Sequence, residues 1–263
     1  DAQESRGLGD VYKRQELEDA EDAIEIDHLD GEIEFKNVWF AYVGEDWILK
    51  DVSFKVKAKE NVAFVGATGS GKTTILSLIV RNYDIQKGQI FIDGLDIKKY
   101  QIASLRKHIG QMLQDVFLFS GTVESNITLR SEEITSDIVK EACRFVNADK
   151  VIDKLPNKYN EIVRERGKNF SSGERQLISF ARVVSHKPNI MILDEATSNI
   201  DTETEALIQD SLKKMMNIGT MLIVAHRLST IQHCDKIIVL KKGKIIESGT
   251  HLELLDKRGH YYN

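Results

Sequence analysis

A glycine-rich segment of the chain has the residue types and the spacing of a loop that binds phosphate groups. Residues 66–73 fit the pattern G-x4-G-K-[S/T] and lie between a predicted buried strand and a predicted helix, the context that the pattern requires. Glycines allow the backbone to curl so that successive N–H groups face one anion, and the start of a helix adds positive potential. Lys72 supplies a charge for the β- and γ-phosphates of a nucleotide, and the Thr73 hydroxyl suits a hard cation such as Mg²⁺. The residues predicted to bind nucleotide here are Gly66, Ala67, Thr68, Gly69, Ser70, Gly71, Lys72, Thr73 and Thr74.

Two carboxylates follow an apolar stretch later in the chain. Ile190–Leu193 is predicted to be a buried strand, and Asp194 and Glu195 come directly after it. Ligands of open α/β sheets lie at the carboxyl ends of strands, so Asp194 can hold Mg²⁺ and Glu195 can orient or deprotonate an attacking water. Two such acids would by themselves more often cap the next helix. Their combination with the phosphate-binding pattern favours the catalytic interpretation.

The segment 170–176, Phe-Ser-Ser-Gly-Glu-Arg-Gln, opens a predicted helix and has two interpretations. Locally, Ser171 is a suitable N-cap, and Glu174 three residues later would complete a capping box. This local interpretation is preferred for the segment in isolation. The segment also resembles the signature motif of ATP-binding-cassette (ABC) ATPases, usually Leu-Ser-Gly-Gly-Gln, and it lies between the phosphate loop and the acidic strand as that motif does.

Further residues stand in the order in which ABC ATPases carry their functional groups, over nearly the whole of residues 32–263. The resemblance implies that Tyr42 stacks on adenine, that Gln114 approaches Mg²⁺ and the attacking water, and that His226 contacts the γ-phosphate. Each feature is weak alone, because a tyrosine more often belongs to a core and a histidine more often ends a strand. The resemblance implies that the catalytic residues are Glu195, His226 and Gln114, and that the metal-binding residues are Thr73, Gln114 and Asp194. The remaining nucleotide-binding residues that it implies are Tyr42, Ser171, Ser172, Gly173, Glu174 and Asp201. Asp201 lies in the segment 198–201, which resembles the D-loop of the family.

Three positions depart from the family pattern. Phe170 replaces the usual signature leucine, Ser172 replaces the first signature glycine, and Leu113 stands where proline is common. Gly173, where the backbone must approach phosphate, is kept. Since none of the departures removes a catalytic group, we expect the chain's own phosphate loop to form a competent site.

The exporter branch of the ABC family gives the best match, because of residues 115–121 (Asp-Val-Phe-Leu-Phe-Ser-Gly), the segment 165–167 and the linker-like residues 16–31. In that branch, transmembrane helices precede this domain in the same polypeptide. The resemblance implies ATP and Mg²⁺ as cofactors, a second nucleotide-binding domain of identical or related sequence as partner, and a location on the cytoplasmic face of the cell membrane. The signature of one protomer would cover ATP bound to the other, and closure of the pair would move the membrane helices. The implied function is ATP hydrolysis that powers transport of a substrate across a membrane.

The elements that must position these residues follow an α/β pattern. Alternating apolar residues predict strands around Ile33 and Val52, and the nearly continuous apolar run Asn61–Val65 predicts a strand buried on both faces. Further strands are predicted at residues 89–93, 190–193, 221–225, 236–240 and 244–247, and helices at residues 72–82, 135–147, 174–185, 202–216 and from 251. With the resemblance, this predicts an α/β P-loop NTPase (RecA-like) core with an antiparallel β subdomain and an inserted α-helical subdomain. The nucleotide-binding domain would span residues 32–263, with the helical subdomain at about residues 115–185.

The two ends of the chain are left out of this fold prediction. Residues 1–31 are polar, and Asp10–Gln15 resembles the translation of a transposon sequencing adapter, so we expect the native sequence to begin near Glu16. An ordinary disordered tail is the alternative. We therefore expect residues 1–31 to be a non-native or disordered leader plus a linker from a missing transmembrane domain. Tyr261–Asn263 follows a helical pattern without a cap, so we expect the chain to be clipped there as well.

Composition excludes several classes of protein. A hydrophobic fraction of 41% and a charged fraction of 29% exclude a disordered chain. No apolar run reaches the roughly eighteen residues of a membrane helix. With 36 basic and 41 acidic residues, a net charge of −5 argues against nucleic acid as a partner. Cys143 and Cys234 lack the spacing of a metal site and are too few for a disulfide framework, which predicts a reducing, cytosolic compartment.

Two other functions share parts of this pattern. A DNA-repair or chromosome-organising ATPase would carry a long coiled coil between the phosphate loop and the signature, but the stretch between Lys72 and Ser171 is too short for one. A nucleotide-sensing module that does not hydrolyse ATP is the other alternative. Glu195 and His226 argue against it, and an assay of phosphate release distinguishes the two.

Overall fold

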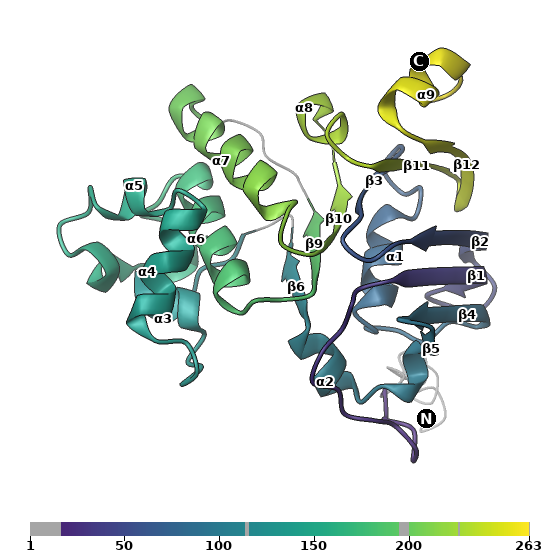
Figure 1. Cartoon of the computed structure of the whole chain (residues 1–263), viewed down its shortest axis with the longest axis horizontal. Coiled ribbons are helices and arrows are strands. Elements are labelled where there is room, and N and C mark those ends of the chain that lie inside the picture. Colours follow the sequence, from purple (N-terminus) through teal and green to yellow (C-terminus); the bar gives the residue numbers. More distant parts are fainter. Residues whose placement is uncertain (1–16, 114–115, 195–199, 226, 263) are drawn as a thin grey trace, which may run out of the picture.

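The computed structural model describes residues 17–113, 116–194, 200–225 and 227–262, and its strands form two main sheets (Figure 1). The smaller sheet is antiparallel, with the order β2-β1-β4-β5. Its strands are β1 (Ile33–Ala41), β2 (Trp47–Val56), β4 (Lys87–Ile92) and β5 (Leu95–Asp96). This sheet is the predicted antiparallel β subdomain.

The larger sheet has the order β12-β11-β3-β10-β9-β6, and its strands are parallel except β12, which is antiparallel to β11. Its strands are β3 (Asn61–Val65), β6 (Ile109–Met112), β9 (Ile190–Asp194), β10 (Thr220–Val224), β11 (Lys236–Lys241) and β12 (Lys244–Gly249). Since β3 and β9 flank β10 and run parallel, the residues that follow them meet at the same edge of the sheet.

The central strands of the larger sheet serve two hydrophobic cores. In β3, Val62 and Phe64 belong to the core shared with α1 (Lys72–Ile79) and the antiparallel sheet, whereas Ala63 belongs to the core on the other face. In β9, Ile192 belongs to the same core as Val62 and Phe64, and Met191 belongs to the core on the other face. Neighbouring side chains of a strand point to opposite faces, so a strand between two cores must be apolar throughout. The continuous apolar run of β3 has this cause.

A helical part (residues 116–185) is inserted between β6 and β9 (Figure 1). It contains α3 (Val123–Thr128), α4 (Ser136–Phe145), α5 (Asp149–Ile152), α6 (Ser172–Ser185) and the short antiparallel pair β7 (Gly121–Thr122) and β8 (Ile162–Val163). The other helices are α2 (Ile102–Lys107), α7 (Thr202–Met215), α8 (Leu228–Ile231) and α9 (His251–Lys257). Every helix in the described part of the chain is too short or too polar to span a bilayer. An α/β core with an antiparallel sheet and a helical insertion confirms the predicted fold class.

Several helices differ from prediction at their ends. The helix predicted over residues 72–82 ends at Ile79, because Arg81 adopts a left-handed conformation with φ 52°. α6 begins two residues before the predicted Glu174, because Ser171 caps it. α9 ends at Lys257, where Arg258 has φ 48°, so the helical pattern does not continue to Tyr261.

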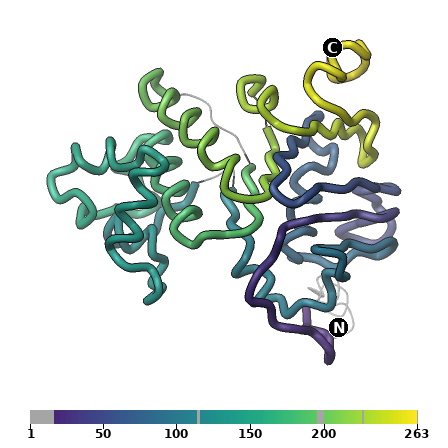
Figure 2. The backbone as a smooth tube through the Cα atoms, viewed as in Figure 1, coloured from purple at the N-terminus to yellow at the C-terminus, as the bar shows by residue number. Residues whose placement is uncertain are grey.

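The described residues 17–31 lie against the core (Figure 2). The backbone N–H of Ile24 donates to the carbonyl of Lys99 at 2.8 Å, and the N–H of Gln101 donates back to Ile24 at 2.9 Å. The N–H of Ile26 donates to the Ser104 hydroxyl at 2.9 Å, and Leu29 is buried. This segment therefore pairs with the chain that leads into α2.

Candidate nucleotide-binding site

The predicted phosphate loop joins β3 to α1, as its pattern requires. Gly66 and Gly71 have φ values of 147° and 105°, which glycine adopts readily and residues with a Cβ rarely do. A Cβ on Gly66 would lie only 2.2 Å from the carbonyl oxygen of Leu240. At Gly69, φ 77°, an added Cβ would meet nothing within 4 Å, so this part of the loop faces open space. The loop has the backbone shape and the open side that a bound phosphate needs.

Lys72 lies in the first turn of α1 and is buried. Its Nζ donates to the carbonyl oxygens of Gly66 at 2.7 Å and Ala67 at 3.1 Å, so the ammonium group is held inside the curl of the loop. Burial lowers the pKa of Lys72 from its usual value, and the nearby Asp194 carboxylate offsets part of this effect. A partly desolvated ammonium group in this position suits a phosphate that would replace its lost water contacts.

Thr73 and Asp194 meet between the phosphate loop and the end of β9. The Thr73 hydroxyl donates to Oδ2 of Asp194 at 3.2 Å. Within the described residues, no group of three or more His, Cys, Asp or Glu side chains is placed to hold a metal ion. Mg²⁺ in nucleotide sites commonly takes one or two protein oxygens and completes its shell with phosphates and waters. The hydroxyl and the carboxylate fit that donor set, and they would hold the ion here.

Tyr42 follows β1 directly and lies beside the first turn of α1. Its hydroxyl is 3.1 Å from the Thr74 hydroxyl, and its side chain is 49% exposed. Such exposure excludes the interpretation of Tyr42 as a core residue. Tyr42 and the buried Asp194 therefore both lie next to the start of α1, where the phosphate loop ends.

The signature-like segment begins α6, and its local interpretation is confirmed. The Ser171 hydroxyl accepts from the N–H of Glu174 at 3.2 Å, and the Glu174 carboxylate accepts from the N–H of Ser171 at 2.8 Å, which completes a capping box. A Cβ on Gly173 would lie 2.4 Å from Cγ2 of Thr204 in α7, so within this chain the glycine is required by helix packing. Figure 1 shows α6 and α1 on different sides of the strands β9 and β10. The structure thus places Ser171, Ser172, Gly173 and Glu174 apart from the phosphate loop of the same chain.

Asp201 caps α7 and does not contact the phosphate loop in any hydrogen bond of the described residues. Its Oδ1 accepts from the N–H of Thr204 at 2.9 Å, and this bond lowers the pKa of Asp201 below its usual value. Gln114, Glu195 and His226, the predicted catalytic residues, lie outside the described residues.

Two residues next to this site were not predicted from the sequence. The ring of Tyr83 contacts the ring of Tyr42, with centroids 5.1 Å apart, and the side chain of Gln86 bonds both backbone groups of Ala41. Tyr83 lies just beyond the predicted helix 72–82, and no local pattern marks either residue. The hydroxyl of Ser70 is buried without a hydrogen-bond partner among the described residues, which leaves one free polar group inside the phosphate loop.

Comparison with known proteins identifies relatives along most of the chain. Residues 49–198, more than half of the chain, match the family model described as ABC transporter. A probable multidrug resistance ABC transporter ATP-binding/permease protein of Bacillus subtilis is 50% identical over 88% of this chain and 34% of its own length. An ATP-dependent lipid A-core flippase of Syntrophus aciditrophicus is 44% identical over 94% of this chain and 41% of its own length. The chain therefore spans less than half the length of these relatives.

A solved structure supports the same assignment. A bacterial Atm1-family ABC exporter with ATP bound superposes with a TM-score of 0.87 and 38% sequence identity, over 94% of this chain and 43% of that one. The fold, the geometry of the phosphate loop and the family match agree with one another. The chain belongs to the ABC transporter family, and its fold matches part of an exporter of that family.

Proposed function

We propose that this chain is the part of a membrane exporter that hydrolyses ATP to power transport of a substrate. The relatives named above are ATP-binding/permease proteins or flippases, and the matched region makes up 34% to 41% of their length. By analogy, a transmembrane domain in the same polypeptide would move the substrate, and this domain would sit at the cytoplasmic face of the membrane. The single observation that carries the proposal is the convergence of Lys72, Thr73 and Asp194 at the phosphate loop.

Within the proposed site, each group has one task. The backbone of residues 66–74 holds the phosphates, Lys72 neutralises part of their charge, and Tyr42 stacks on the adenine. Thr73 and Asp194, together with Gln114, would hold Mg²⁺. The bound ion would neutralise charge that develops on the phosphate oxygens during transfer.

Hydrolysis requires a water and a group that acts on it. Glu195 follows the metal-side Asp194 by one residue, so it is proposed to orient the attacking water and accept its proton. His226 is proposed to contact the γ-phosphate from the end of β10. Lys72 would stabilise the negative charge of the departing phosphates in a partly desolvated setting, where such stabilisation is strongest.

A second nucleotide-binding domain, identical or related, is proposed to complete the site. The N-terminus of α6, with Ser171–Glu174 at its start, carries positive potential that suits the γ-phosphate. In one chain this helix end lies away from the phosphate loop (Figure 1). Pairing of two domains head to tail would bring each signature to the other's phosphate loop, and hydrolysis would release the pair.

The contact to the membrane part is proposed to lie at residues 117–119. Leu118 is fully buried, whereas Phe117 and Phe119 are about half exposed, and their rings contact each other. Arg182 donates to the carbonyl of Phe117 at 3.1 Å, and Asn126 bonds both backbone groups of Phe119. This backbone is therefore held so that the two phenylalanines face outward, where they could receive a short helix of the transmembrane domain.

Phosphate release from ATP tests the proposed function. The chain, at a protein concentration high enough for pairing, should release phosphate in the presence of Mg²⁺, and Lys72→Met should reduce the rate by about 10²-fold or more. Lys98→Met, at an exposed lysine after β5, is the matched control and should leave the rate unchanged. ATP binding without phosphate release under these conditions would instead identify a nucleotide-sensing module.

A further inference from the structure

We infer that the loop 81–86, which follows α1, is a positioning element for the base of the nucleotide, with Tyr83 and Gln86 holding Tyr42 in the orientation that stacks on adenine. This inference rests on the proposed role of Tyr42. Neither residue would touch the phosphates, and both act through Tyr42 or the residue before it.

The ring of Tyr42 contacts two other aromatic rings, Phe40 and Tyr83, which also contact each other with centroids 5.7 Å apart. Phe40 and Tyr42 form a T-shaped pair with centroids 4.9 Å apart and an interplanar angle of 86°. Tyr83 contacts Tyr42 in the same manner at 5.1 Å and 85°. Phe40 is buried and belongs to the core, so Tyr83 is the outer of the two supports. Edge-to-face aromatic pairs have a preferred geometry, and they therefore fix a ring rather than merely cover it.

The backbone that carries Tyr42 is held by the same loop. Oε1 of Gln86 accepts from the N–H of Ala41 at 3.1 Å, and Nε2 of Gln86 donates to the carbonyl of Ala41 at 2.9 Å. The N–H of Gln86 also donates to the carbonyl of Trp39 at 3.3 Å. One side chain thus satisfies both polar backbone groups of the residue that precedes Tyr42, at the point where β1 ends.

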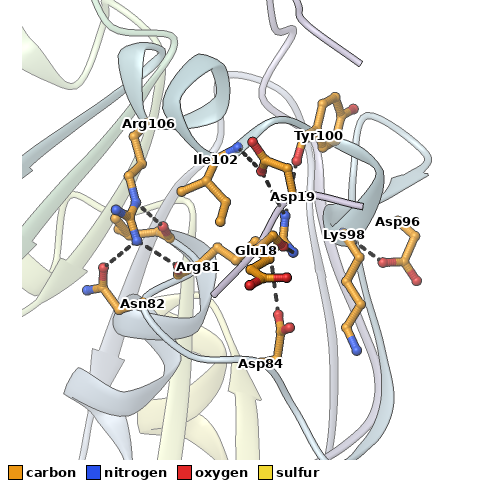
Figure 3. Close-up of polar contacts among 11 residues, drawn as sticks. Glu18, Asp19, Arg81, Asn82, Asp84, Asp96, Lys98, Tyr100, Ile102 and Arg106 are labelled. Atoms are coloured by element: carbon orange, nitrogen blue, oxygen red, sulfur yellow. Dashed lines mark hydrogen bonds and ion pairs between the residues drawn. The ribbon is translucent and has the colours of Figure 1, made fainter. Parts of the chain in front are cut away.

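The loop can provide this support because it is itself fixed at its start (Figure 3). The buried Arg81 donates to the carbonyl of Tyr100 at 3.0 Å and to that of Glu18 at 3.2 Å, and its Nε lies 3.4 Å from Asp84. Arg106 donates to the carbonyl of Arg81 at 2.8 Å. Arg81, before Tyr83, is therefore tied to α2 and to the N-terminal segment, and Asp84, after Tyr83, is tied to Arg81.

A fixed platform changes affinity for a base without changing affinity for phosphate. A half-exposed tyrosine has several rotamers, and a base that stacks on it must pay for their loss unless the ring is already held. Tyr42 is already held without a nucleotide. Its side chain contacts Phe40, Tyr83 and the Thr74 hydroxyl, and Gln86 holds the backbone of the preceding Ala41. Loss of Tyr83 or Gln86 should therefore weaken binding of the base only.

Binding of ATP and of inorganic tripolyphosphate to the chain, measured by calorimetry, tests this inference. Tyr83→Ala should weaken the affinity for ATP by about two- to tenfold, which corresponds to the loss of one aromatic pair. The affinity for tripolyphosphate should stay unchanged. Tyr83→Phe should restore ATP binding, because the ring and not the hydroxyl makes the contact. Gln86→Ala should act in the same direction as Tyr83→Ala. Tyr262→Ala and Gln232→Ala, at exposed positions outside this region, are the matched controls and should bind ATP normally.

Tyr42→Ala separates this inference from the proposed function. Tyr42→Ala should weaken ATP binding more than Tyr83→Ala does. The double variant should bind ATP as weakly as Tyr42→Ala alone, because the ring to be positioned is gone. Normal ATP binding by Tyr83→Ala beside weakened binding by Tyr42→Ala overturns the positioning role alone. Normal binding by Tyr42→Ala overturns both the adenine site and its support. If Tyr83→Ala weakens the binding of ATP and of tripolyphosphate equally, Tyr83 has a general structural role, which also contradicts the inference.

Discussion

The hydroxyl of Thr73 donates a hydrogen bond of 3.2 Å to the carboxylate of Asp194, which joins the first turn of α1 to the end of β9. The two residues are 121 positions apart in the chain. They meet because β3 and β9 run parallel on either side of β10, so that the segments after both strands leave the same edge of the sheet. This contact links the phosphate loop to the acidic strand and defines where a cation would lie.

Asp194→Asn tests the metal-binding role of this pair. The variant should bind ATP at least about tenfold more weakly in Mg²⁺, because the amide is a poorer and uncharged ligand. In EDTA its ATP affinity should equal or exceed that of the parent chain, since a negative charge near the phosphates has been removed. Calorimetric titrations with and without Mg²⁺ measure both quantities, with Asp256→Asn as an exposed control. An equal loss under the two conditions would show that Asp194 supports the fold rather than the ion.

Gly173→Ala tests whether the signature glycine is required by packing within the chain. The new methyl group would lie 2.4 Å from Cγ2 of Thr204, so the variant should lose about 1–3 kcal/mol of stability to overpacking. Thr204→Ser removes that methyl group and keeps the N–H that bonds Asp201. The double variant should recover part of the loss in a urea denaturation experiment. Unchanged stability of Gly173→Ala would contradict the packing explanation and leave approach to a partner's phosphate as the reason for the glycine.

The cap of α7 should make stability depend on pH. The bond from the Thr204 N–H lowers the pKa of Asp201 in the folded chain, so its contribution is present above the unfolded pKa, near 3.8, and is lost as the pH falls through the folded pKa. Asp201→Ser keeps a capping oxygen that does not titrate. The difference in melting temperature between the parent and this variant should therefore shift in favour of the serine as the pH falls below about 4. A difference that stays constant between pH 7 and pH 3 would show that the Asp201 carboxylate does not stabilise α7.

Crosslinking in the intact protein tests the proposed contact to a membrane part. A cysteine at Phe119, which is 54% exposed, should crosslink to the proposed transmembrane domain. A cysteine at Leu252, which is 71% exposed in α9, is the control and should not. Crosslinking of Leu252 but not Phe119 would place the membrane contact on another face of the domain.

Much of the fold was predictable because strong periodic signals governed it. β3 has the bounds that its apolar run predicts, since a strand between two cores leaves no room for polar side chains. The end of α1 was not predictable, because the left-handed turn at Arg81 is held by Tyr100 and Glu18, which are distant in sequence.

The candidate site was predictable where chemistry depends on local spacing, as in the phosphate loop. It was not predictable where a residue acts through a distant neighbour. Tyr83 and Gln86, in the loop after α1, contact Tyr42 and Ala41 at the end of β1, and nothing in the surrounding sequence marks those contacts. The packing of Gly173 against Thr204 likewise depends on how α6 meets α7.

Phosphate release by Glu195→Gln tests the proposed ATPase mechanism most directly. The phosphate loop and Tyr42 are proposed to bind nucleotide without any proton transfer, whereas Glu195 is proposed to act on the attacking water. Glutamine keeps the size of the side chain but cannot accept the proton, so turnover should fall by about 10²–10⁴-fold while ATP affinity is retained. Because hydrolysis would reopen the pair, the variant should also accumulate as an ATP-bound dimer on size-exclusion chromatography at high protein concentration. Hydrolysis by Glu195→Gln at the parent rate would contradict the assignment of the catalytic carboxylate, and loss of ATP binding would make Glu195 a metal ligand or a structural residue instead.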